Sequence, residues 1–547
     1  MSETVRKICY YSFMKTSNTD SGQDLLSPLN PIYKVWNYIP KYTKIQFFSA
    51  FIIGLLVHSY IMANGFINHD SVVISEYYSW AHALSGRWFA IVPDMISSSF
   101  SLMWLNGLFA IIYISISICL IGACLEIRRT PLILLLSGLV VSFPAAAGWF
   151  SYRLYTDINF FAVLLVCVAI YLALRYKYGF LFGAIPLLFS IAIYQAYIGF
   201  FAGIFVLILI RDIFKDQKVK TIVVRGLKYL STLIIGLVAY VIILNLPTYS
   251  GLTSYKEIDS FGGFTLQSLP ERFSFSYQNF FDVFFRNTLN IHQDYMQSGQ
   301  VFKYLFVITA IVIFVLLICI IINKKIYREI PRLILLFILI ALLPPTTNAI
   351  GILSPNSIYI LMQYSLVLIF VFMLMIVDVY IDSPKAGLSF AGSKIAYYSS
   401  WFVMVFCFII IVNYTIYTNV FYYKMEIVNK QGYAFTSTLV TRIQSEDFYD
   451  IDKNIILYGE LPQSYSLGYF ENMHAIPLGD IPNMYSFPAY LLIYFDLRNS
   501  VSFSKAYLPP EINDNEDAMA YIRGMPPYPS SGSIAEVEGV IIVKYSD

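Results

Sequence analysis

Long apolar runs separated by short polar segments make up most of the chain between positions 47 and 416. A helix needs about 20 apolar residues to cross the roughly 30 Å hydrocarbon core of a bilayer. Nine separate runs meet or approach that length, at 47–63, 103–125, 131–149, 158–174, 229–245, 302–322, 333–345, 357–378 and 396–416. The pattern predicts a protein built mainly from membrane-spanning helices.

The apolar stretch 180–210 is too long for one crossing helix. Basic residues flank it on both sides, and Tyr194-Gln195-Ala196 lies near its middle. We expect two short helices that turn at these three residues. This interpretation brings the expected number of spans to eleven.

Lysine and arginine are unevenly distributed over the connecting segments of this eleven-span scheme. With the N-terminus inside, the inner segments carry 22 basic residues and the outer segments carry 5. Cytoplasmic loops are enriched in Lys and Arg, so this count favours a cytoplasmic N-terminus and an outer C-terminus. A single helix over 180–210 would place the four basic residues of 323–332 outside, which the same rule disfavours.

The composition agrees with a polytopic membrane protein. Hydrophobic residues make up 58% of the chain and charged residues only 13%, with a mean hydropathy of +0.65. The six cysteines show no CxxC spacing and no Cys/His cluster. We therefore expect neither disulfides nor a structural zinc site. No signal-peptide pattern precedes the first apolar run, so we expect that run to remain as a helix. A net charge of +2 gives no argument for nucleic-acid binding.

After Tyr417 the composition becomes polar, which predicts a small domain on the outer face. Its expected elements are a helix around 422–445, a strand at 454–459, a short helix near 515–523 and a last strand at 539–544. The predicted fold class is an all-α polytopic membrane protein with a small C-terminal α/β extracytoplasmic domain. The three expected parts are a cytoplasmic or interfacial segment 1–46, a transmembrane domain 47–416 and the outer domain 417–547.

The first predicted outer loop holds residues suited to chemistry at a membrane surface. Asp70 lies a few residues past the first span, and His82, Arg87 and Trp88 lie further along the same loop. Asp70 is a candidate catalytic carboxylate, and the other three are candidates for binding a substrate or its phosphate. Three of them also have a structural interpretation: a loop carboxylate or helix cap for Asp70, an interfacial polar residue for His82 and an interfacial anchor for Arg87.

Two further outer segments add candidates. Arg153 and Asp157 lie where a span begins, four positions apart, so on one helix they would share a face and could form a simple ion pair. Asp157 also suits the N-cap of that span. Tyr194 and Gln195 are either a plain turn or residues that line a cavity, because polar groups at membrane depth need partners.

Several motifs occur along the chain in a recognisable order. They are Asn68-His-Asp-Ser71, Ser85-Gly-Arg-Trp88, Tyr155-Thr-Asp157, Ile193-Tyr-Gln-Ala-Tyr197, Ser437-Thr-Leu-Val-Thr-Arg-Ile443 and Met525-Pro-Pro-Tyr-Pro-Ser-Ser-Gly-Ser-Ile534 followed by 539–544. In order, spacing and topology the chain resembles the Gtr-type serotype-converting glucosyltransferases of bacteria and their phages, within the wider GT-C class. The resemblance extends over nearly the whole chain. Ser71 departs from it, since such proteins often have a second acidic residue there.

The resemblance implies transfer of a sugar, usually glucose, from undecaprenyl-phosphate to an O-antigen or other surface polysaccharide unit at the outer face of the inner membrane. In an inverting transfer a carboxylate takes the proton of the acceptor hydroxyl, and a cation stabilises the departing phosphate. We therefore assign Asp70 as base and Arg87 or Arg153 as phosphate clamp, with Arg87 favoured. Asp157 would orient the acceptor or share the base role.

The resemblance also carries expectations about partners. They are the lipid-linked donor as co-substrate, a polysaccharide acceptor, membrane lipids, a donor synthase and a flippase, with no cofactor and no metal site assigned. Metal dependence stays open at this stage. Two alternatives remain: a transporter or flippase of lipid-linked sugars, and an O-antigen polymerase or ligase. The donor discriminates among them, because only the proposed transferase needs a polyprenyl monophosphate sugar.

Overall fold

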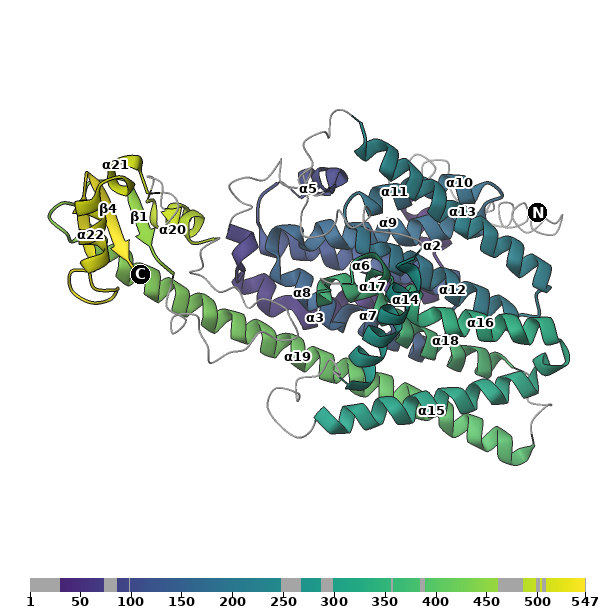
Figure 1. Ribbon diagram of the computed structural model, residues 1–547. Helices are drawn as coiled ribbons and strands as arrows, with labels where there is room; N and C mark the ends of the chain where they lie inside the picture. The colour runs from purple at the N-terminus through teal and green to yellow at the C-terminus, as the bar shows by residue number, and fades with distance from the viewer. Residues whose placement is uncertain are drawn as a thin grey trace.

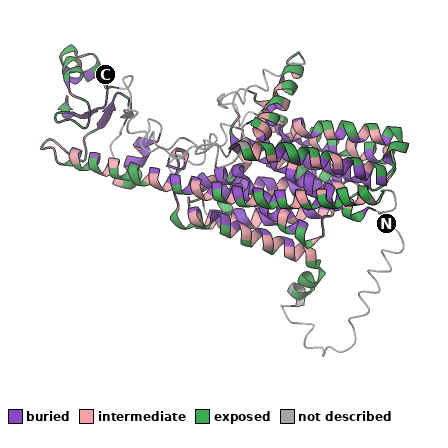
Figure 2. Ribbon diagram, turned by 90° about the horizontal axis from the view of Figure 1, so that it is seen from below, coloured by how far each residue is buried: buried purple, intermediate pink, exposed green. Residues whose placement is uncertain are grey.

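The computed structural model describes residues 30–72, 86–97, 99–246, 267–286, 299–355, 358–383, 389–460, 486–497, 502–503 and 508–546. Figure 1 shows a bundle of helices that one long helix, α19, joins to a small domain containing the β-strands. Figure 2 shows buried residues concentrated inside the bundle, with exposed positions on its outer helices. A mostly helical protein with a small C-terminal sheet is what the sequence predicts.

The bundle combines long helices with shorter ones. The helices are α2 (Asn30–Tyr38), α3 (Lys41–Asn64), α5 (Ile91–Ile96), α6 (Met103–Leu125), α7 (Thr130–Ser142), α8 (Pro144–Ser151), α9 (Thr156–Arg175), α10 (Gly179–Phe182), α11 (Ala184–Ile191), α12 (Ile198–Phe214), α13 (Val219–Leu244), α14 (Leu269–Phe281), α15 (Gly299–Asn323), α16 (Ile330–Thr347), α17 (Ile350–Leu353), α18 (Leu368–Asp382) and α19 (Phe390–Gln444). Within the described ranges, nine helical segments are long and apolar enough to cross a membrane, or ten if α7 and α8, bent by 44°, count together. The total of eleven would also require the shorter apolar segment Gly179–Ile191 to cross, and it stays a prediction.

The break predicted within 180–210 is confirmed. Helix α11 ends at Ile191, Tyr194 has extended backbone with φ −155° and ψ 111°, and α12 begins at Ile198. Helices α10 and α11 run back along α9, with the Ser190 hydroxyl donating to the Ala162 carbonyl over 2.9 Å. Close packing requires glycine at position 179, because a Cβ there would lie 1.8 Å from the Leu172 carbonyl oxygen.

A second break divides the predicted span 131–149. Phe143 has extended backbone, and Pro144 starts α8. Proline lacks the N–H that would continue the helical hydrogen bonds, and it disfavours helical backbone in the residue before it. The two halves therefore meet at an angle rather than as one straight helix.

The last membrane helix continues far beyond its apolar part. Helix α19 has 55 residues, which corresponds to about 80 Å at 1.5 Å per residue. The span 396–416 and the helical stretch 422–445, treated separately in the sequence, belong to this one helix. The predicted domain boundary at 416/417 thus falls inside a continuous helix.

The small domain at the end of α19 contains a four-stranded sheet in the order β2-β1-β4-β3. The strands are β1 (Ile455–Tyr458), β2 (Ser502–Phe503), β3 (Ile534–Val537) and β4 (Val540–Lys544), and the helices are α20 (Phe487–Phe495), α21 (Pro510–Asn513) and α22 (Glu516–Gly524). Strand β1 pairs in parallel with β2 and β4, whereas β3 and β4 are antiparallel. Leu439 and Ile443, near the end of α19, pack with Leu457 and Ile541 in its core, which anchors the domain to the helix.

Candidate functional site

The candidate residues lie at the end of the bundle where α3 ends and α6, α9 and α12 begin. Gly86 and Arg87 precede a short 3-10 turn, Trp88–Ala90. The loop is attached to the break between α11 and α12, because the Phe89 amide donates to the Ala192 carbonyl over 3.1 Å. Tyr240 Oη, from the end of α13, donates to the Gly86 carbonyl over 3.2 Å.

The structure brings three predicted substrate-binding residues together. The Arg87 guanidinium carbon lies 4.9 Å from the centre of the Tyr194 ring, a cation–π distance. Gln195 Nε2 donates to Tyr240 Oη over 2.8 Å, and this hydroxyl also holds the Gly86 carbonyl. Arg87, Tyr194 and Gln195 thus form one group, although they come from segments more than 100 positions apart.

The Arg87 side chain is available for a further partner. Its Nε atom is buried and has no hydrogen-bond partner among the residues that the structure describes, and no described carboxylate forms an ion pair with it. Trp88 beside it packs edge-on against Phe89 and Phe189, at ring-centre distances of 5.8 and 6.2 Å. A partly buried guanidinium without a counterion suits an incoming anion such as a phosphate.

Asp157 lies in the first turn of α9 and is fully buried. Asn106 Nδ2, on α6, donates to Asp157 Oδ1 over 3.0 Å, and the same amide nitrogen lies 3.3 Å from Ser97 Oγ. Asp157 Oδ2 has no hydrogen-bond partner in the described part of the chain. The N-cap of α9 is Tyr155, so the N-cap interpretation of Asp157 is wrong.

Arg153 does not form the ion pair that its spacing from Asp157 allows. It lies in a 3-10 turn, Arg153–Tyr155, before α9 begins at Thr156. Its Nη2 atom donates to the Ser101 carbonyl over 2.9 Å instead. An i, i+4 pair needs both residues in one α-helix, and this condition is not met here.

Asp70 has a different set of neighbours from Arg87, Arg153 and Asp157. Its side chain is 30% exposed, and its Oδ1 lies 3.5 Å from His69 Nε2. The loop is fixed on both sides of Asp70: Asn68 Oδ1 accepts from the Ser71 amide over 2.9 Å, and Ile67 bonds to α19. Among the residues that the structure describes, no hydrogen bond or ion pair joins Asp70 to Arg87, Arg153 or Asp157.

The attachment of this loop to α19 is reciprocal. Asn429 Oδ1 accepts from the Ile67 amide, and Asn429 Nδ2 donates to the Ile67 carbonyl, both over 2.9 Å. Ile67 and Val72 are buried in the same core as Leu439 of α19 and Leu457 of the small domain. The small domain and the Asp70 loop therefore pack as one unit.

Aromatic contacts connect the Arg87 group with the Asp157 group. The Trp149 ring meets the Tyr194 ring edge-on at 4.9 Å, and the Thr156 hydroxyl donates to the Trp149 carbonyl over 3.2 Å. Asn106 and Tyr240 were not among the predicted site residues. The signal for Asn106 was a polar amide inside an apolar span, where such groups need partners.

His82 and the question of a metal site complete the comparison with the sequence analysis. His82 lies outside the described residues. Among the described residues, no group of three or more His, Cys, Asp or Glu side chains is arranged to hold a metal ion.

Comparison with known families identifies the protein at the family level. The family model Glucosyl transferase GtrII matches residues 59–381, which is more than half of the chain. The chain belongs to the GtrII glucosyl transferase family. Together with the apolar helices, this makes the protein a membrane glycosyltransferase. Searches of curated proteins and of solved structures gave no match.

The matched region of this GtrII family member contains the candidate site. It includes all eight predicted site residues, from Asp70 to Gln195, and stops one residue before the end of α18. The motifs at 437–443 and 525–544, which carried part of the resemblance, lie beyond it. The predicted family is confirmed over 59–381.

Proposed function

We propose that the protein transfers a glucosyl group from undecaprenyl-phosphate glucose to a sugar of an O-antigen or other surface polysaccharide. The reaction takes place at the outer face of the bacterial inner membrane, with the N-terminus in the cytoplasm and the C-terminal domain in the periplasm. The family match over 59–381 carries this proposal, because it contains every candidate site residue.

Arg87 is the proposed phosphate clamp. A guanidinium can donate two parallel hydrogen bonds to phosphate oxygens, and the Tyr194 ring holds this one at 4.9 Å. The Gly86 backbone has φ +75°, and its carbonyl is bound by Tyr240, so the loop that presents Arg87 is fixed before a ligand arrives. Arg153, already bonded to the Ser101 carbonyl, is the weaker candidate.

Asp70 is the proposed general base. The acceptor hydroxyl oxygen attacks the anomeric carbon, the bond from that carbon to the donor phosphate oxygen breaks, and the hydroxyl proton passes to the Asp70 carboxylate. Undecaprenyl phosphate leaves, and Arg87 stabilises the negative charge that builds on its phosphate. Asp70 is exposed enough to meet an acceptor from solvent, since 30% of its side chain is accessible.

Asp157 has the proposed role of orienting the acceptor. One of its oxygens accepts a hydrogen bond from Asn106, and the other has no partner in the described residues. A buried carboxylate oxygen with free lone pairs can accept a hydrogen bond from a sugar hydroxyl. His82, Trp88, Tyr194 and Gln195 complete the proposed substrate-binding set.

The proposed partners follow from the donor and acceptor. A donor synthase must make the lipid-linked sugar, and a flippase must bring its polar head to the outer leaflet, because sugars and phosphates cross apolar hydrocarbon poorly. The lipid tail of the donor would lie among membrane lipids beside the bundle. The proposed transfer uses no cofactor other than this co-substrate.

The structure of the surface polysaccharide tests this proposal. Mass spectrometry and NMR of polysaccharide from cells with and without the intact gene should differ by one glucosyl branch on the repeat unit. A polymerase or ligase would change chain length or attachment instead. A transporter would leave the purified protein without transfer activity in detergent, where no membrane separates two compartments. Either result would overturn the proposal.

A further inference from the structure

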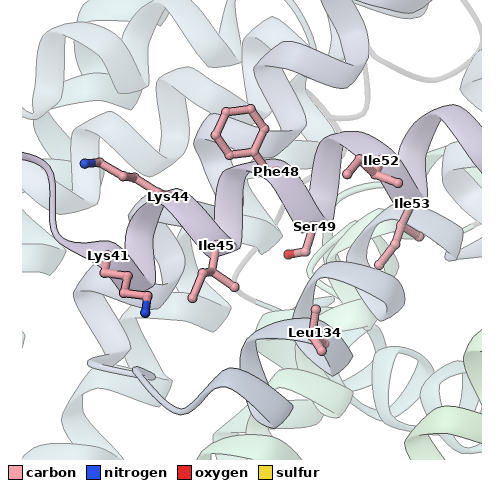
Figure 3. Close-up of a pocket in the computed structure, with 8 residues that line it drawn as sticks. All are labelled: Lys41, Lys44, Ile45, Phe48, Ser49, Ile52, Ile53 and Leu134. Atoms are coloured by element: carbon pink, nitrogen blue, oxygen red, sulfur yellow. The ribbon is translucent and has the colours of Figure 1, made fainter. Parts of the chain in front are cut away.

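The outward face of α3 forms an apolar groove at the end of the bundle opposite the candidate site. The groove has a volume of about 510 Å³, and Figure 3 shows its lining along α3 together with one residue of α7. Besides two lysines, the lining residues are Ile45, Phe48, Ser49, Ile52, Ile53 and Leu134. The Ser49 hydroxyl is already bonded to Ser137 Oγ over 2.9 Å. Apart from the two lysines and Ser49, the groove is lined by apolar side chains, which suits a hydrocarbon chain.

Basic side chains gather where the groove begins. Lys41 and Lys44 stand at one end of the lining residues (Figure 3), in the first turn of α3. Lys44 Nζ lies 4.3 Å from the centre of the Trp36 ring, which leaves its N–H groups free to donate elsewhere. Arg128 lies 5.6 Å from the ring of Tyr42, at the same end of α3.

These cations differ from other basic residues at this end of the bundle. Arg129 pairs with Asp378 and Asp382 at 2.5 Å, and Arg211 pairs with the same Asp378 at 2.9 Å. Within the described ranges, by contrast, no carboxylate lies within 4.0 Å of a charged nitrogen of Lys41, Lys44 or Arg128. The described part of the chain therefore supplies no carboxylate partner for this positive charge, which suits an external anion.

The neighbouring helix α2 has the character of an interfacial helix. Tyr33, Val35, Trp36 and Tyr38 are all exposed on it, with exposed fractions from 46% to 89%. Aromatic residues of this kind gather at the level of lipid headgroups. This places the mouth of the groove at headgroup depth and its apolar length at the depth of acyl chains.

We propose that this groove binds one anionic glycerophospholipid, with its phosphate between Lys41 and Lys44 and an acyl chain along α3 and Leu134. In the proposed orientation the lipid belongs to the cytoplasmic leaflet. Helix α3 has 24 residues, about 36 Å in length, so this phosphate lies on the opposite face of the membrane from Arg87. The site is therefore distinct from that of the donor phosphate.

Native mass spectrometry of the purified full-length protein tests the site. The protein is incubated with phosphatidylglycerol, with phosphatidylcholine and with undecaprenyl phosphate, and bound lipid is counted as detergent is removed. We expect one phosphatidylglycerol to be retained in preference to phosphatidylcholine. A lysine near an anionic lipid contributes about fivefold to affinity, so Lys41→Gln with Lys44→Gln should weaken retention roughly twentyfold.

A matched pair and a groove variant complete the test. Lys218→Gln with Lys220→Gln removes two exposed lysines at the same end of the bundle that do not line the groove, and it should leave retention unchanged. Leu134→Trp fills the groove without a change of charge and should also reduce retention. Equal loss in both lysine pairs, retention unaffected by Leu134→Trp, or preference for undecaprenyl phosphate would each overturn the proposal.

Discussion

Replacing Arg87 by lysine keeps the positive charge but removes the planar group that the proposed phosphate clamp needs. Two interactions are weakened. The stacking on the Tyr194 ring, at 4.9 Å, contributes about 1 kcal/mol. The second hydrogen bond to phosphate, which a lysine point charge does not reproduce in the same geometry, contributes about 2 kcal/mol. A combined loss of about 3 kcal/mol corresponds to roughly a hundredfold decrease in kcat/KM.

The assay measures donor binding and glucosyl transfer with undecaprenyl-phosphate glucose for the variant and for a matched control. Arg153→Lys is the control, because within the described residues Arg153 donates to the Ser101 carbonyl, and a lysine can also donate to a carbonyl. We expect less than a tenfold decrease for Arg153→Lys. An Arg87→Lys protein that binds donor and turns over within threefold of the unmodified protein would refute the assignment, and so would the reverse order of the two variants.

Three further predictions concern the loop positions and the topology. Asn429→Leu removes both hydrogen bonds to the Ile67 backbone, which contribute about 1 kcal/mol each. Because these bonds hold the Asp70 loop, the variant should lower kcat with little change in the KM for the donor, and a normal kcat would contradict this. Gly86→Ala should lower transfer at least tenfold, because the new Cβ would lie 2.7 Å from Tyr240 Oη and the backbone at position 86 has φ +75°. Gly524→Ala is the control: a Cβ at that position would meet no atom within 4 Å, so this variant should be neutral in the same assay. Reporter fusions at Gln217 and Ser531 should give cytoplasmic and outer signals respectively, and a cytoplasmic signal at Ser531 would rule out the eleven-span topology.

The lengths of the apolar runs, and the polar residues that interrupt them, made most of the bundle predictable. The break near Tyr194-Gln195-Ala196 followed from a run too long for one span, and the structure has extended backbone at Tyr194. The continuity of α19 could not be read in the same way. The polarity change after Tyr417 marks where the helix surface meets a different environment, and a helical backbone can continue across such a change.

The sequence predicted which residues belong to the candidate site better than it predicted the contacts among them. Arg87 and Tyr194 were candidates separately, but their stacking depends on how two distant loops pack, which one sequence does not encode locally. The spacing of Arg153 and Asp157 suggested a pair, and it failed because α9 starts between them. The attachment of the Asp70 loop to Asn429 joins positions 362 apart and had no sequence signal.

Transfer of labelled glucose by purified protein tests the central claim most directly. The unmodified protein and Asp70→Asn are each given undecaprenyl-phosphate glucose and isolated surface polysaccharide, and label in the polysaccharide is measured over time. Asparagine keeps the shape of the side chain and removes its basic oxygen, so transfer should fall by about two to four orders of magnitude while the protein remains folded and binds donor. Absence of transfer by the unmodified protein, or Asp70→Asn activity within a few-fold of it, would contradict the account.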